Sequence, residues 1–143
     1  MGRLFLEVIT PEKILASREI DSVIAPGTEG EFGVLPNHIN FLSGIVPGEL
    51  RYNVGSKWEY LCVTTGFVEV SSDRVSILAD AAERFIDIDL DRAQSALDRA
   101  KERLSKDRDN KEIDFSRAEA ALKRATARIK AARKAQDIII SNI

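Results

Sequence analysis

The chain has 143 residues, of which 44% are hydrophobic, so it can form one medium domain or one small domain with an appendage. Its formal net charge of −2 predicts no general attraction to nucleic acid. The single cysteine, Cys62, excludes an intramolecular disulfide and a cysteine-based zinc site, and fits a reducing cytoplasm. The first residues lack a signal-peptide core and the longest apolar run is far short of a membrane span, so we expect membrane contact only through partners.

Residues 1–87 are typical of short β-strands separated by turns. The expected strands are residues 4–9, 14–17, 20–25, 50–54, 67–70 and 75–79. Gly55 marks a tight two-residue hairpin turn, and the strand after it alternates, with Trp58, Tyr60 and Cys62 on one face. This spacing predicts an antiparallel sandwich or barrel. Several strands carry apolar residues on both faces, which predicts that one outer face docks on a partner.

Residues 27–38 hold three glycines, a proline and the only histidine, which predicts a shaped, exposed loop rather than a helix. A catalytic site at His38 would need Cys62 or a distant serine, so we expect this histidine to order the loop or contact a partner. Cys62 lies among apolar residues and is expected to be an unreactive core thiol. The sequence has no phosphate-binding loop, dinucleotide fingerprint or metal-ligand cluster, so we predict no enzyme and no catalytic or metal site.

After Asp87 the apolar residues recur every three or four positions, which predicts an antiparallel hairpin of helices of about 16 and 25 residues. The stripes are Leu90, Ala93, Leu97, Ala100 and Leu104, then Phe115, Ala118, Leu122, Ala125, Ile129 and Ala132. Asp89 and Asp114 are expected N-caps, with a polar connector at 105–111. The predicted fold class is therefore α+β, with an N-terminal antiparallel β-sandwich (1–87) followed by a C-terminal antiparallel two-helix hairpin (88–143).

The second helix is basic, and both stripes alternate large residues with alanine. Residues 1–87 carry 7 Lys and Arg against 13 Asp and Glu, whereas residues 114–143 carry 7 against 3. The basic segment fits an acidic or phosphate-bearing partner, or is only a solvated helix face. Because alanine buries little area, the hairpin could leave its resting place, or it could be an alanine-rich coiled coil that never moves. The sequence leaves both interpretations open.

Arginines follow steps of seven and four residues on both helices. They are Arg92, Arg99 and Arg103 on the first helix and Arg117, Arg124 and Arg128 on the second. This spacing keeps each set on one helix flank, where like charges four residues apart repel by a few tenths of a kcal/mol. An anion between the flanks would relieve the repulsion, and so would pairing with nearby carboxylates such as Asp89 and Asp98.

Four short motifs, in this order and at these separations, resemble the epsilon subunit of bacterial F-type ATP synthase. Residues 30–38 read Gly-Glu-Phe-Gly-Val-Leu-Pro-Asn-His, 47–50 Pro-Gly-Glu-Leu, 65–70 Thr-Gly-Phe-Val-Glu-Val and 81–83 Ala-Ala-Glu. Each is weak alone, but together with the charged, alanine-rich tail they cover nearly the whole chain. The resemblance implies a non-catalytic rotor subunit of the central stalk, which joins the gamma subunit to the c-ring in ATP synthesis driven by proton transport. It also implies a peripheral position on the cytoplasmic face of the bacterial inner membrane.

The resemblance further implies roles for single residues. The loop that faces the c-ring would hold Glu31, Phe32, Gly33 and His38. Some family members bind ATP as a regulatory ligand through Ile/Leu-Asp-x-x-Arg-Ala, which Ile88, Asp89, Arg92 and Ala93 fill here. The matching upstream carboxylate is Glu83, and the further arginines of this site are Arg99, Arg124 and Arg128. Carboxylates near the base and ribose, with arginines on phosphate, make chemical sense.

By the same resemblance, the hairpin can extend into the catalytic hexamer and inhibit ATP hydrolysis. The residues that would then meet an acidic segment of the beta subunit are Lys123, Arg128, Lys130, Arg133 and Lys134. A nucleic-acid partner is a poor fit, because no aromatic residues interleave with these charges. The alternative function is a free-standing nucleotide-sensing module whose hairpin closes on ATP.

Overall fold

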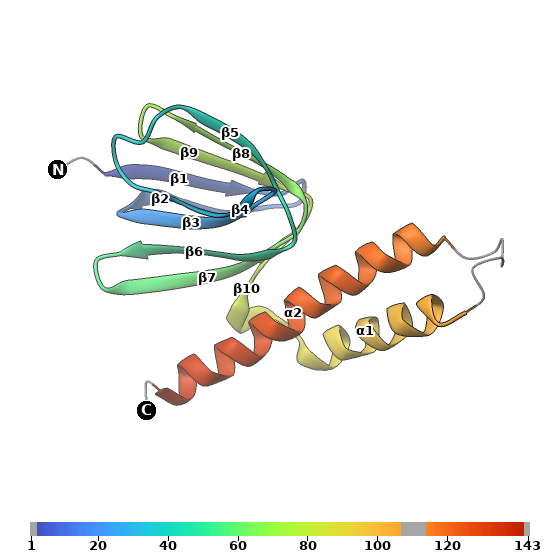
Figure 1. The fold of residues 1–143 in the computed structure, drawn as a ribbon. Helices are drawn as coiled ribbons and strands as arrows, with labels where there is room; N and C mark the ends of the chain where they lie inside the picture. Colours follow the sequence, from blue (N-terminus) through green and yellow to red (C-terminus); the bar gives the residue numbers. More distant parts are fainter. Residues whose placement is uncertain (1–2, 107–113, 142–143) are drawn as a thin grey trace. The chain divides into compact units, whose positions relative to one another are not determined.

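The computed structural model describes residues 3–106 and 114–141, with side chains as far as residue 137. The chain divides into two compact units, Met1–Arg84 and Phe85–Ile143. The first is built from strands and the second from helices (Figure 1). The boundary predicted after Asp87 falls at the end of a short 3-10 helix, η1 (Phe85–Asp87), which belongs to the second unit.

Over the residues that the structure describes, the first unit forms one ten-stranded sheet. Its strands are β1 (Leu4–Ile9), β2 (Ile14–Ile20), β3 (Ser22–Gly27), β4 (Gly30–Val34), β5 (Phe41–Ile45), β6 (Gly48–Val54), β7 (Lys57–Val63), β8 (Gly66–Ser71), β9 (Arg74–Ala79) and β10 (Ala82–Arg84). Their order is β10-β7-β6-β3-β5-β8-β9-β1-β2, and β4 pairs with β3. Because β2 at one end contacts β6 and β10 at the other, the sheet folds back on itself, and the predicted β-sandwich is confirmed. The strand pairs are antiparallel except for β1 and β9, which run parallel.

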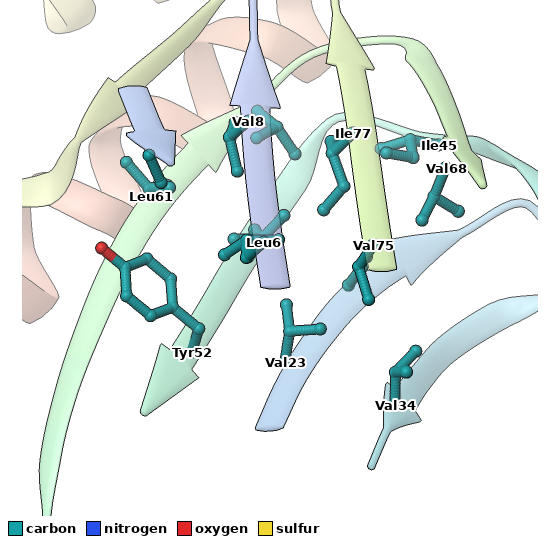
Figure 2. Packing of buried hydrophobic residues seen from close by; sticks show 14 of the residues in the cluster. Leu6, Val8, Val23, Val34, Ile45, Tyr52, Leu61, Val68, Val75 and Ile77 are labelled. Atoms are coloured by element: carbon teal, nitrogen blue, oxygen red, sulfur yellow. The ribbon is translucent and has the colours of Figure 1, made fainter. Parts of the chain in front are cut away.

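One hydrophobic core fills the sandwich. Leu6 and Val8 of β1 point into it beside Val75 and Ile77 of β9, and all four are fully buried (Figure 2). Burying each such side chain stabilises the fold by about 1.5–3 kcal/mol. Because side chains alternate along a strand, this core also decides which side chains face outward.

The prediction that residues 27–38 are a loop throughout was wrong, because Gly30–Val34 form β4. Gly27 pairs with Gly30 around a two-residue turn, and Val34 is buried in the core. The alternation of Phe32 and Val34 was hidden by the glycines between and around them. The strands β5 and β10 were also not predicted.

The predicted hairpin turn at Gly55 is confirmed. β6 and β7 pair as far as Val54 and Lys57, and Gly55 between them holds φ 62°, in the left-handed region that glycine enters without strain. Cys62 of β7 is buried, as predicted.

In its described residues, the second unit contains η1 and two helices, α1 (Leu90–Leu104) and α2 (Phe115–Ser141). At 1.5 Å per residue, α2 is about 40 Å long. Both predicted N-caps are confirmed. The Asp89 carboxylate accepts a hydrogen bond from the backbone N–H of Arg92 at 3.1 Å, and Asp114 accepts one from Arg117 at 3.1 Å. These bonds satisfy donors that a helix start otherwise leaves open.

The two helices pack against each other along the predicted stripes. The residues of this seam that are buried are Ala93, Ala100, Ala118, Ala125, Ile129 and Ala132. The leucines of the stripes are only half-buried. Most of the buried seam side chains are thus single methyl groups, each of which contributes little to stability. Of the predicted connector 105–111, only residues 105 and 106 lie in the described part of the chain.

Candidate functional site

The hairpin of β3 and β4 carries three of the residues predicted to face the c-ring. Glu31 and Gly33 of β4 are exposed, and Phe32 between them is half-buried. His38 is half-buried in the loop that follows β4. Glu31 was expected in an ordered, exposed loop, but it lies in a paired strand opposite Pro26.

A bidentate ion pair holds the Glu31 carboxylate. Arg51 of β6 donates from Nη2 to Glu31 Oε1 at 3.0 Å and from Nη1 to Glu31 Oε2 at 3.2 Å. The same Nη1 donates to Glu49 Oε2 at 2.8 Å. The hydrogen bonds to Glu31 raise the pKa of the Arg51 guanidinium further above its ordinary value, although partial burial opposes this. Two carboxylates thus share one guanidinium.

Aromatic contacts support the loop around His38. The ring of Phe41 lies edge-on to Phe32 at 5.1 Å between centroids, and edge-on to His38 at 6.0 Å. His38 Nδ1 donates to the backbone carbonyl of Ile39 at 2.7 Å. Leu35 and Ile39 flank this cluster, and they are 64% and 77% exposed. The packed rings of Phe32, His38 and Phe41 therefore support a loop that exposes two apolar side chains, Leu35 and Ile39, to solvent.

A second anchor for this loop comes from the turn between β8 and β9. The backbone N–H of Asn37 donates to Asp73 Oδ1 at 2.6 Å. Neither Asp73 nor Arg51 was predicted to belong to the site. Both lie far away in sequence, 36 residues from Asn37 and 20 from Glu31, so no local pattern could have revealed them.

A separate apolar surface lies on the outer face of β8, β9 and β1. Phe67 pairs with Leu78, and Leu78 pairs with Ile9, so the three side chains form one row across the sheet. Phe67 and Leu78 are 63% and 54% exposed. The row borders an open pocket of about 620 Å³, which Gly44 and Thr28 also line. The sandwich thus has the exposed apolar face that the strand pattern predicted.

The predicted nucleotide residues are divided between the two units. Glu83 lies on β10, paired with Cys62 in the sandwich, whereas the other residues of this site lie in the helical unit. Ile88 and Ala93 are buried at the start of α1. Asp89 is exposed, and its carboxylate caps α1.

Four arginines of the predicted nucleotide site each come immediately before a seam residue that is buried. These pairs are Arg92–Ala93, Arg99–Ala100, Arg124–Ala125 and Arg128–Ile129. In two antiparallel helices, the positions just before the seam point to the same side of the pair. Arg92, Arg99 and Arg124 are exposed, and Arg128 is half-buried.

For Arg92, Arg99 and Arg124, the described residues do not support the alternative that nearby carboxylates neutralise the arginines. Asp89 caps the helix, and Asp98 accepts a hydrogen bond from the side-chain amide of Gln94 at 3.1 Å. Over the part of the chain that is described, no acidic side chain lies within 4.0 Å of the guanidinium of Arg92, Arg99 or Arg124.

The basic residues predicted to meet the beta subunit lie along α2. Lys123, Lys130, Arg133 and Lys134 are exposed. Within residues 3–106 and 114–141, no helix is both long and apolar enough to cross a membrane. The same residues contain no group of three or more His, Cys, Asp or Glu side chains placed to hold a metal ion.

Family models match both units of the chain. The model described as ATP synthase, Delta/Epsilon chain, beta-sandwich domain, matches residues 3–85, and the long alpha-helix domain of the same chain matches residues 87–133. Two solved mitochondrial ATP synthases contain similar chains. One, from Euglena gracilis (OSCP/F1/c-ring), gives a TM-score of 0.78 at 21% identity over 89% of this chain and 79% of that one. The other, from the central stalk and c-ring of Tetrahymena thermophila, gives 0.60 at 17% identity over 94% and 96%. At these identities they support the fold.

Curated bacterial relatives are much closer in sequence. The ATP synthase epsilon chain of Nitratidesulfovibrio vulgaris (strain DP4) is 52% identical over 103 residues, which cover 72% of this chain and 77% of the relative. That of Syntrophobacter fumaroxidans is 49% identical over 110 residues, which cover 77% and 82%. Together with the two matched domains, these identities show that the chain belongs to the epsilon-subunit family of the bacterial ATP synthases.

Proposed function

We propose that this chain is the non-catalytic rotor subunit that joins the gamma subunit to the c-ring in the central stalk. The observation that carries the proposal is the surface of residues 31–39, which contacts from other strands and turns hold in one shape. It lies on a sandwich that belongs to the epsilon-chain family. Torque can pass only through a contact that does not yield, and this surface is held by an ion pair, aromatic contacts and a backbone anchor.

The c-ring contact would use Glu31, Phe32, Gly33 and His38. The half-buried Phe32 and His38 hold the shape of the surface. The Glu31 carboxylate, which Arg51 holds, and the side chains of Leu35 and Ile39 are exposed and would contact the other protein. Protein–protein contacts typically combine apolar side chains at the centre with polar and charged side chains at the rim, and Leu35 and Ile39 beside Glu31 fit this composition.

The gamma subunit needs a different surface from the c-ring. The apolar row of Ile9, Phe67 and Leu78, with the pocket beside it, is the best-supported candidate in the sandwich. Exposed apolar side chains in a row favour a partner that stays bound, because separation would return them to water. The rotor would thus lie at the cytoplasmic face of the bacterial inner membrane, held there by these partners.

The hairpin would regulate hydrolysis and bind ATP as a regulatory ligand. Its seam of alanine methyl groups supports a hairpin that can open. Its arginines before the seam lie on one side, and among the described residues no carboxylate pairs with Arg92, Arg99 or Arg124. The arginines on this side repel one another, and ATP phosphates between the helices would relieve that repulsion only when the hairpin is closed. Opened, α2 would present its basic residues to the beta subunit and stop rotation.

Co-purification from native membranes tests the rotor assignment. We expect the chain to be isolated with gamma and the c-ring, whereas a free-standing nucleotide-sensing module would be isolated alone. The rate of ATP hydrolysis tests whether the hairpin inhibits the enzyme. An enzyme whose chain lacks residues 114–143 should hydrolyse ATP faster than wild type at every ATP concentration, and an unchanged rate would contradict the inhibitory role.

A further inference from the structure

Arg51 reaches across one strand to hold Glu31. Arg51 lies on β6, opposite Ile24 of β3, and Glu31 lies on β4, opposite Pro26 of the same strand. The guanidinium therefore spans β3 to form its two bonds with Glu31, at 3.0 and 3.2 Å. Glu49, two residues before Arg51 on the same face of β6, takes a third bond at 2.8 Å.

The geometry of this pair restricts orientation more than it adds stability. A guanidinium that donates two parallel bonds to one carboxylate fixes the plane of that carboxylate, which a lysine ammonium cannot do. The Glu31 side chain is 51% exposed and that of Arg51 is 24% exposed. Ion pairs exposed to this degree contribute little to folding, because water screens them. The ion pair with Arg51 instead holds the exposed Glu31 carboxylate in one orientation.

We propose that Arg51 is a positioning residue: it fixes the Glu31 carboxylate in the direction needed for contact with the c-ring, and Glu49 fixes the guanidinium from its other side. The inference rests on the proposed contact of residues 31–38 with the c-ring. It adds two residues to that contact which do not need to touch the partner. It also explains why the cluster has two carboxylates for one guanidinium, since the second one holds the donor in place.

The test is binding of the full chain to detergent-solubilised c-ring, together with the ratio of proton pumping to ATP hydrolysis in the reconstituted enzyme. The variants are Arg51→Gln, Arg51→Lys, Glu31→Ala and the double variant Arg51→Gln/Glu31→Ala. Arg3→Gln is the matched control, because Arg3 also pairs with two carboxylates, Glu19 at 3.7 Å and Asp21 at 3.3 Å, away from this site. Thermal unfolding of each full-length variant, compared with wild type, checks that the variant is folded.

We expect Arg51→Gln to bind the c-ring about tenfold more weakly, the loss typical of one misdirected charge-assisted hydrogen bond. Arg51→Lys should be nearly as weak although it keeps the charge, and Arg3→Gln should bind as wild type. The double variant should be no weaker than Glu31→Ala, because Arg51 acts only through Glu31.

Three results would overturn the inference. Wild-type binding by Arg51→Gln, when Glu31→Ala binds weakly, would leave the c-ring contact intact and remove the positioning role. Full recovery with Arg51→Lys would show that charge alone matters. Additive losses in the double variant would show that Arg51 acts independently of Glu31. Wild-type binding by Glu31→Ala would instead contradict the proposed c-ring contact itself.

Discussion

The backbone N–H of Asn37 donates to the Asp73 carboxylate at 2.6 Å, and both residues hold left-handed backbone, with φ 68° and 60°. This conformation is uncommon outside glycine, although Asn and Asp tolerate it best. The bond ties the loop after β4 to the turn between β8 and β9. Two unfavourable backbone positions thus support each other at the surface proposed to meet the c-ring.

Substitution of Asn37 tests this anchor. We expect Asn37→Gly to keep the stability of wild type, because glycine accepts this φ. Asn37→Val should cost about 1–2 kcal/mol, because a β-branched residue is strained there. The measurement is urea unfolding of the full chain followed by circular dichroism, and equal midpoints for the two variants would show that the left-handed position is not restrictive.

Gly66 should be the least replaceable glycine of the outer apolar surface. A Cβ at this position would lie 2.0 Å from the carbonyl oxygen of Leu78 and 2.8 Å from Ala79 Cα, and neither backbone atom can move without breaking the β8–β9 pairing. We expect Gly66→Ala to destabilise the sandwich by about 2 kcal/mol or more.

Gly33→Ala is the matched control for Gly66→Ala. It has nothing closer than 3.8 Å to the new methyl group, so its unfolding midpoint should stay near that of wild type. Equal losses of stability from the two variants would contradict the steric explanation.

Acid should remove part of the sandwich stability through Asp21. The backbone N–H of Gly55, 2.5 Å from the carboxylate, is the main cause that lowers the pKa of Asp21 from its ordinary value of 3.8, and Arg3 adds to it. A depressed pKa in the folded state means that this stabilisation is fully present above the unfolded pKa and is lost as the pH falls through the folded pKa.

The Asp21→Asn variant isolates this effect. It should unfold at lower urea than wild type near neutral pH, and the difference should shrink as the pH falls below the unfolded pKa and through the lower folded pKa of Asp21. A difference that stays constant over this range would show that the carboxylate charge is not responsible.

Asp89→Asn separates the structural role of this residue from its proposed role in ATP binding. Asparagine is as good an N-cap as aspartate, so the helix content should not change. If the carboxylate contacts ATP, the affinity should fall several-fold, and Asp114→Asn, the equivalent cap of α2, should leave it unchanged. Calorimetric ATP titration of the full chain is the measurement. Equal affinities for Asp89→Asn and wild type would limit Asp89 to capping.

The same ATP titration tests whether the arginines beside the helix seam contribute to ATP affinity. Arg92→Ala and Arg124→Ala should each weaken ATP binding, because a charge-assisted bond to phosphate is lost. In the reconstituted enzyme each should also increase inhibition at a given ATP concentration, because less ATP holds the hairpin closed. Lys101→Ala, an exposed position one residue after the seam residue Ala100, should change neither quantity. If the arginine variants match wild type throughout, the flanks are only solvated surface.

Sequence patterns predicted the elements that depend on local chemistry. The helical stripes, the caps at Asp89 and Asp114 and the turn at Gly55 all follow from the period of the chain or from one side chain. The strand β4 was missed because glycines interrupt its alternation. The anchors Arg51 and Asp73 could not be predicted, because sheet pairing brings them to the loop from distant strands and turns. The motif predicts which residues form the contact surface, and the fold shows which side chains hold them in place.

The most direct test of the rotor assignment is ATP-driven proton pumping by the reconstituted enzyme with Glu31 and His38 replaced singly and together by alanine. Hydrolysis should continue while pumping falls, with the largest fall in the double variant, because torque no longer reaches the c-ring. Thermal unfolding of the double variant should match that of wild type, since neither side chain is part of the core. A double variant that pumps as many protons per ATP as wild type would contradict the assignment of this surface to the c-ring.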